Sequence, residues 1–189
     1  EEDLAIWSEL ELLMEKKVAL EAPRSFQSAG GMPLVLRAQA LVKFAETGDP
    51  DDAQRARDID CRRDAVQEAL FADHLARARN HLPADDPYLG VLLGDRDPTA
   101  AVEQLVEKSQ LRDERFLEKL IAAGAEAINE SSDAAIKAAR AIRPLALANK
   151  KRQGEIDAAE SRLQARLANL LFSVYGDDVS PDATFTLRF

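Results

Sequence analysis

The strongest constraint on the fold is the spacing of apolar residues, which recur every three or four positions along most of the chain. The first such stripe contains Trp7, Leu10, Met14 and Val18, and the last one runs from Ile156 to Val174. This spacing gathers apolar side chains on one face of an α-helix, whereas a half-buried strand would need strict alternation. The chain is therefore predicted to be all-α, an irregular multi-helix bundle in which each stripe is a packing face.

Glycine and proline divide this pattern into separate helices. A first helix is expected over about Asp3–Ala22, and a second one follows Pro33 and ends at Gly48. We expect these two helices to pack against each other as a hairpin. The segment from Asp51 to about Leu82 contains neither glycine nor proline, so it is predicted to be helical throughout.

Residues suited to capping mark the later helix starts. Asp97 followed by Pro98 combines an N-cap side chain with proline at the first helical position. Ser132 or Asp133 is expected to cap a long final helix, and Gly176 is a suitable C-terminal cap for it. Two capped helices are therefore predicted in the second half of the chain.

The last residues have a different character. Thr184 to Phe189 alternate and are rich in β-branched and aromatic side chains, so they are predicted to form one short C-terminal β-strand. A single strand cannot satisfy its own backbone groups. Either this segment frays, or the sheet that it joins lies in sequence outside this chain.

The charge of the chain excludes several classes of partner. The formal net charge is -9, from 25 basic and 34 acidic residues, and the basic residues are scattered. Such a surface repels phosphate backbones and anionic lipid head groups, so neither nucleic acid nor membrane is expected as a partner. The single cysteine, Cys61, excludes an internal disulfide and is expected to be a buried, inert thiol.

The two histidines do not suit a metal site. His74 and His81 lie seven residues apart on one predicted helix, which separates their Cα atoms by about 10.5 Å. That separation is too large for both rings to bind one zinc ion easily, so two ordinary surface or boundary histidines are expected.

The remaining polar candidates also have ordinary structural explanations. Ser131 and Ser132 precede a helix, where a hydroxyl caps free amides, and no Gly-x-Ser-x-Gly turn is present. Gly30 and Gly31 lack the spacing of a phosphate-binding loop, and the basic run Lys150–Arg152 is followed at once by acidic residues. We therefore expect no catalytic residue, no cofactor-binding residue and no metal ligand in this segment, and we assign no substrate-binding residue.

A resemblance to a known family rests on the end of the chain. Residues Tyr175–Arg188 read YGDDVSPDATFTLR, and Asn169–Gly176 supply the end of the preceding helix. This passage resembles the bacterial dipeptidyl-peptidase family of serine peptidases typified by dipeptidyl peptidases 7 and 11, peptidase family S46. The stretch Ser131–Arg140 is also similar to that family. The likeness is good from about residue 115 onward, while the first 110 residues match mainly in being helical.

The resemblance implies a chymotrypsin-type double β-barrel with a large helical domain inserted in the chain. Residues 1–179 would be the helical cap over the active-site cleft, and residues 180–189 would begin the strand that returns into the barrel. The family's catalytic histidine and aspartate precede the insertion and its serine follows it. None of those motifs occurs here, so the segment itself is expected to be non-catalytic.

The same resemblance implies the function and the surroundings of the parent protein. It would be a serine hydrolase that removes dipeptides from the free amino terminus of peptides, exported to the periplasm or outside the cell. Its partners would be the barrel domain of the same chain and peptide substrates, with a homodimer left open. Members often carry an asparagine where this chain has Gly30, Gly31 and Met32, so substrate preference is left open. The alternative is a helical protein-interaction or dimerisation module without catalysis.

Overall fold

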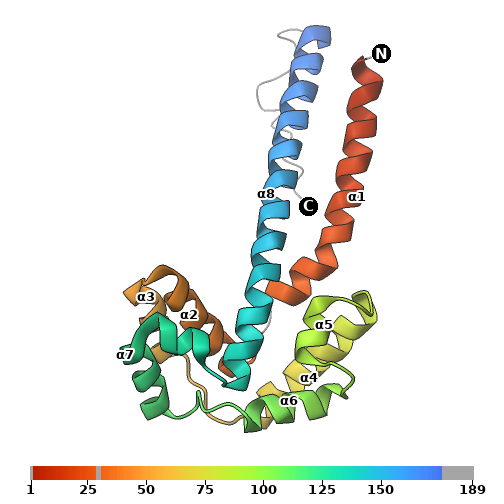
Figure 1. Ribbon diagram of the computed structural model, residues 1–189. Coiled ribbons are helices and arrows are strands. Elements are labelled where there is room, and N and C mark those ends of the chain that lie inside the picture. The colour runs from red at the N-terminus through yellow and green to blue at the C-terminus, as the bar shows by residue number, and fades with distance from the viewer. Residues whose placement is uncertain (1, 29–30, 176–189) are drawn as a thin grey trace. The chain divides into compact units, whose positions relative to one another are not determined.

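The computed structural model describes residues 2–28 and 31–175 of the chain, and within these ranges eight helices are present (Figure 1). No helix among these residues is long and apolar enough to cross a membrane. In chain order the helices are α1 (Glu2–Ser28), α2 (Pro33–Thr47), α3 (Pro50–Asp58), α4 (Ala65–His81), α5 (Pro87–Leu92), α6 (Pro98–Glu107), α7 (Glu114–Glu130) and α8 (Ala134–Tyr175).

The predicted fold class needs one correction. The described residues are helical and contain no β-strand, so the all-α part of the prediction is confirmed and its strand component is wrong. The segment Thr184–Phe189 that was predicted as a strand lies outside the described residues. The physical reason for the correction is the lack of a partner, because the described part of the chain offers no sheet edge to which an added strand could hydrogen-bond.

The N-terminal capping residues predicted for α6 and α8 are confirmed, while the predicted C-terminal cap Gly176 lies outside the described residues. The Asp97 carboxylate accepts a hydrogen bond of 2.9 Å from the backbone amide of Thr99, and Pro98 is the first residue of α6. Asp133, rather than Ser132, caps α8. Gly48 ends α2 in the left-handed region, at φ 69°, which favours glycine because it has no Cβ.

The segment from Asp51 to Leu82 is not one helix, as was predicted, but two. Helix α3 ends at Asp58, where the following residue Ile59 is extended, and α4 begins at Ala65. The Asp64 carboxylate caps α4 by accepting hydrogen bonds from two backbone amides. A helix can therefore end without glycine or proline where an aspartate is placed to start the next one.

The chain divides into two compact units, and the division falls within α1 and within α8. One unit consists of residues 21–149. In it α2 packs against α3 and α7, and α4 packs against α5 and α6. Its apolar core includes Leu34, Leu41, Leu75, Leu111 and Ile136, whose side chains are almost completely buried. These helices hold the site described below.

The other unit consists of residues 1–20 and 150–189. Within its described part, Leu13 and Leu20 of α1 pack against Ile156 and Leu163 of α8. Two ion pairs link the same helices, Lys17 with Glu160 at 2.6 Å and Arg166 with Glu9 at 2.8 Å. The packing face predicted over Ile156 to Val174 is therefore confirmed for Ile156, Ala159 and Leu163, whereas Val174 at its far end is 71% exposed. The predicted hairpin of the first two helices is wrong for this part of α1, because its buried residues Leu13 and Leu20 pack against α8. The predicted stripe residues Trp7, Met14 and Val18 are exposed instead of packed.

Candidate functional site

A group of buried polar and aromatic side chains joins the end of α1 to α4, α5 and α8, within the unit of residues 21–149. Helix α1 continues past Pro23 to Ser28, although a proline inside a helix removes one backbone hydrogen bond. Phe26 and Gln27 lie in this last part of α1. Their contacts with the other helices give the extension the tertiary support that offsets the missing bond.

Gln27 is a buried amide that links three elements. Its side-chain oxygen accepts a hydrogen bond of 2.6 Å from Asn149 Nδ2 in α8. Its Nε2 donates to Asp86 Oδ1 at 3.2 Å. The same Asp86 oxygen accepts from the backbone amide of Tyr88 at 2.8 Å and so caps α5. Gln27 and Asn149 are only 7% and 4% exposed, so these partners satisfy polar groups that water cannot reach freely.

His74 lies close to this amide bridge, is half-buried and has aromatic rings as neighbours. Its Nε2 lies 3.1 Å from the hydroxyl oxygen of Tyr88, which is buried. The ring of Phe71 stacks on the imidazole at a centroid distance of 5.9 Å, and the ring of Phe26 lies at 5.3 Å. Burial lowers the pKa of His74, because an apolar surrounding disfavours the charged ring, and the hydrogen bond to the Phe26 backbone acts in the opposite direction. Burial also raises the pKa of Tyr88 well above its usual range.

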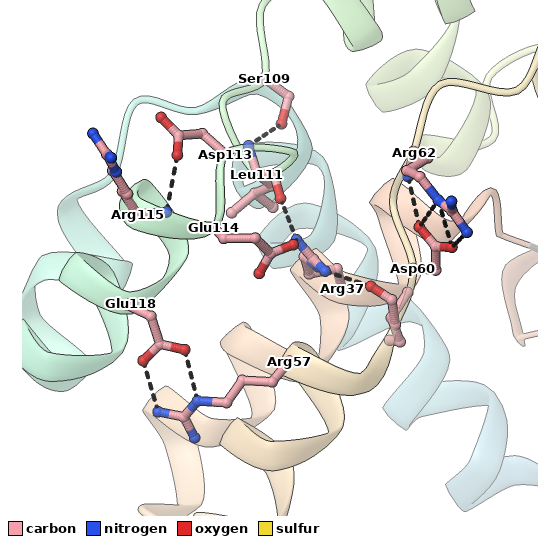
Figure 2. A network of polar contacts seen from close by, with 11 residues as sticks. Arg37, Arg57, Asp60, Arg62, Ser109, Leu111, Asp113, Glu114, Arg115 and Glu118 are labelled. Carbon is pink, nitrogen blue, oxygen red and sulfur yellow. Dashed lines mark hydrogen bonds and ion pairs between the residues drawn. The ribbon is translucent and has the colours of Figure 1, made fainter.

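A second buried polar network surrounds Arg37 of α2 (Figure 2). The Arg37 side chain is 1% exposed and donates to the carbonyl oxygen of Leu111 at 2.7 Å and to Glu114 Oε1 at 3.0 Å. It also donates to the carbonyl oxygen of Ile59. One guanidinium thereby ties α2 to two loops and to the start of α7, which is the geometry of a structural anchor.

The structure shows where the candidates named from the sequence lie. His74 and His81 both face Phe26, and His81 Nδ1 donates to the carbonyl oxygen of Arg77 at 3.0 Å. Cys61 is buried, as predicted, and burial is the main cause that raises the pKa of its thiol. No group of three or more histidine, cysteine or acidic side chains suited to a metal ion occurs among the described residues.

Of the two serine candidates, Ser131 takes part in a loop and cap network that also contains Ser109. Ser109 donates to Asp133 Oδ1 at 2.9 Å, and Ser131 Oγ accepts from the backbone amide of Asp133 at 3.3 Å. Ser132 is exposed, and so is the basic run Lys150–Arg152. Of the two glycines, Gly31 is partly buried and Gly30 lies outside the described residues. The structure brings both histidines to the ring of Phe26, and no contact given for the described residues joins these serines to either histidine.

Sequence reasoning missed the polar residues that join the helices. Gln27 and Asn149 carry no pattern, because their partners are distant in the sequence. Arg37 did leave a signal: it is a charged residue inside the apolar run of α2, and a charge placed on a core face requires buried partners. Tyr88 follows a proline at the start of a short helix and gives no indication of its contact with His74.

Three comparisons with known proteins complete this description. The family model described as Peptidase S46 matches residues 1–189, which is the whole chain. No curated protein and no solved structure matches it. The family match therefore rests on the sequence along its full length.

Proposed function

The chain belongs to the peptidase S46 family, and from this membership we propose that it is the helical cap of a dipeptidyl peptidase. The cap, residues 1–179, would close over the active-site cleft of a catalytic domain in the same parent chain and would itself supply no catalytic group. The observation that carries the proposal is the combination of a peptidase family match over all 189 residues with described residues that are helical.

The contacts of the candidate side chains support the proposal that this domain supplies no catalytic group. A serine nucleophile needs a base within hydrogen-bond reach, and a histidine base needs a free ring nitrogen. His74 Nε2 is engaged with the Tyr88 hydroxyl, and the ring is half-buried beside Phe26 and Phe71. Ser109 is bonded to the carboxylate that caps α8. These groups therefore already have structural partners.

The surface of the unit formed by residues 1–20 and 150–189 suits contact with another domain. Trp7, Met14 and Val18 of α1 are 59%, 55% and 66% exposed, and they recur at helical spacing on one face. A row of large exposed apolar side chains marks an interaction surface more often than free surface. The same row also suits the alternative, a helical interaction or dimerisation module, so the decisive test is enzymatic.

The test uses the full-length parent and dipeptidyl-coumarin substrates with free or acetylated amino termini. The proposal expects cleavage of the free substrates and not of the acetylated ones. A matched parent in which a short linker replaces the cap should lose this discrimination or most of its activity, because closure and exclusion of longer chains are the cap's contributions. If a folded parent cleaves neither class, the peptidase proposal is wrong and the interaction module is favoured.

If the parent is active, the activity of the linker-replaced parent shows whether these helices control substrate choice. An unchanged ratio of free to acetylated cleavage after replacement would show that these helices do not control substrate choice. The catalytic domain of the replaced parent must remain folded for this comparison, and circular dichroism together with labelling of its active serine by a fluorophosphonate checks that condition.

A further inference from the structure

Both histidines of the sequence lie against a single aromatic ring. The ring of Phe26, near the end of α1, is 5.3 Å from the imidazole of His74 and 5.8 Å from that of His81, between centroids. The two histidines are seven residues apart on α4, so they lie on one face of that helix. The contact between the end of α1 and α4 is therefore built around the two groups that ordinarily change charge between pH 5 and 8.

Protonation of His74 conflicts with its surroundings. In the neutral ring Nε2 can accept a hydrogen bond from the Tyr88 hydroxyl, whereas in the charged ring both nitrogens carry protons and Nε2 can only donate. Once Nε2 carries a proton it must donate, and the buried hydroxyl has to turn away from it. The charged ring would also lie beside the rings of Phe71 and Phe26, where it is half-buried and so has less water around it than in the unfolded chain.

The charged groups nearby do not remove this conflict. On α4 itself Asp73 favours the protonated ring and Arg77 opposes it, and these two are bonded to each other at 3.0 Å. On the side of α5, Asp86 already accepts from Gln27 and from the Tyr88 amide. His81, also on α4, lies against the same ring of Phe26 and supplies no negative charge.

We propose that this contact is an acid-released latch, in which protonation of His74 frees the last part of α1, residues 21–28, from α4 and α5. The latch is closed above the ordinary histidine pKa of 6.5 and opens progressively as the pH falls below it. The sign follows from the lowered pKa of His74: the released state binds the proton more readily than the closed state, so acid favours release. The inference does not depend on the proposed function of the parent.

The size of the effect has an upper limit. If the closed latch excludes the proton entirely, the equilibrium constant for opening rises about tenfold between pH 7.5 and pH 5.5. The buried Cys61 thiol does not contribute in this range, because burial raises its pKa. Opening that depends on pH within this window therefore reports on the histidines.

Amide hydrogen exchange of the 189-residue chain, measured by mass spectrometry and corrected for intrinsic rates, tests the latch. Peptides covering residues 21–28 should show a several-fold rise in opening from pH 7.5 to pH 5.5. The variant His74→Gln keeps a hydrogen-bonding group but cannot titrate, and it should abolish the rise. The matched variant His81→Gln, at an exposed position, should retain most of it. An equal rise in His74→Gln, or no rise in the unmodified chain, would overturn the proposal.

A second measurement covers the case in which His74→Gln fails to fold. In the unmodified chain the two imidazoles can be titrated by NMR and assigned with His81→Gln. The latch requires His74 to titrate below 6.5, and a His74 that titrates at or above this value would refute it.

Discussion

Replacing Arg37 by methionine should be among the most destabilising single changes in the unit of residues 21–149. Methionine fills most of the space of the arginine stem but donates no hydrogen bond. The carbonyl oxygens of Leu111 and Ile59 would lose their guanidinium donors, and the Leu111 bond lies in the buried interior. Each buried group left without a partner costs about 1–3 kcal/mol, so we expect Arg37→Met to lower the free energy of unfolding by about 2–5 kcal/mol.

Urea unfolding followed by circular dichroism at 222 nm measures this change. Since single domains have free energies of unfolding of about 5–15 kcal/mol, the midpoint should fall by a large fraction of its value. The matched control is Glu114→Gln. Glu114 is bonded to the same guanidinium, but its side chain is 66% exposed, so the control should cost under about 1 kcal/mol.

The comparison separates two explanations of the network. If the two carbonyl bonds are the source of stability, Arg37→Met is costly and Glu114→Gln is not. If the ion pair were the source, the two variants would have similar costs. A loss below about 1 kcal/mol for Arg37→Met would refute the reasoning, because it would mean that the carbonyls find other donors or water.

Three further changes test separate parts of the fold. Asp133→Ala removes a carboxylate that accepts from Ser109, from the Gln110 amide and from two amides at the start of α8, and it should lower the free energy of unfolding by about 2–3 kcal/mol in thermal denaturation. Gly124→Ala should destabilise by about 1 kcal/mol, because Gly124 has φ 81°, a backbone conformation that residues with a Cβ rarely adopt. An added Cβ meets nothing within 4 Å, so no steric clash adds to this cost, and a stabilised variant would instead indicate a helical conformation. Leu163→Ala should cost about 2–4 kcal/mol and raise amide exchange across residues 150–175, and unchanged exchange there would contradict the packing of Leu163 on α1.

Local signals in the sequence predicted the helix boundaries well where a cap was present. The pair Asp97 and Pro98 fixed the start of α6, and Asp133 was one of two candidates for the start of α8, because capping depends on residues only two or three positions away. The break at residues 59–64 was missed because glycine and proline were the only stop signals considered. Asp64, the actual cap of α4, has the same local chemistry as Asp97 and could have been found by the same rule.

The partners of each helix could not be predicted in the same way. Periodicity shows which face of a helix is buried, but many helices in a chain offer a suitable face. The stripe from Trp7 to Val18 therefore had an apparent partner in the next helix. The structure instead leaves Trp7, Met14 and Val18 exposed and packs Leu13 and Leu20 against Ile156 and Leu163, more than 130 positions away. Gln27 and Asn149 are another distant pair, 122 positions apart. Contacts of this kind depend on the assembled core, so they leave no local pattern.

The family match shows how little of the family relationship can be recognised from individual residues in the helical part of the chain. The motif from Tyr175 to Arg188 pointed to the family from a short stretch with unusual residues, while the first 110 residues resembled it mainly in being helical. Helical packing faces tolerate exchange among apolar residues of similar size, so few positions within them are distinctive. A family model sums weak preferences at many positions, and it matches residues 1–189. Residues before position 110 therefore carry family information too. Exchange is costly at buried polar positions that join the helices, such as Gln27 and Arg37, so we expect the family information to concentrate at such positions.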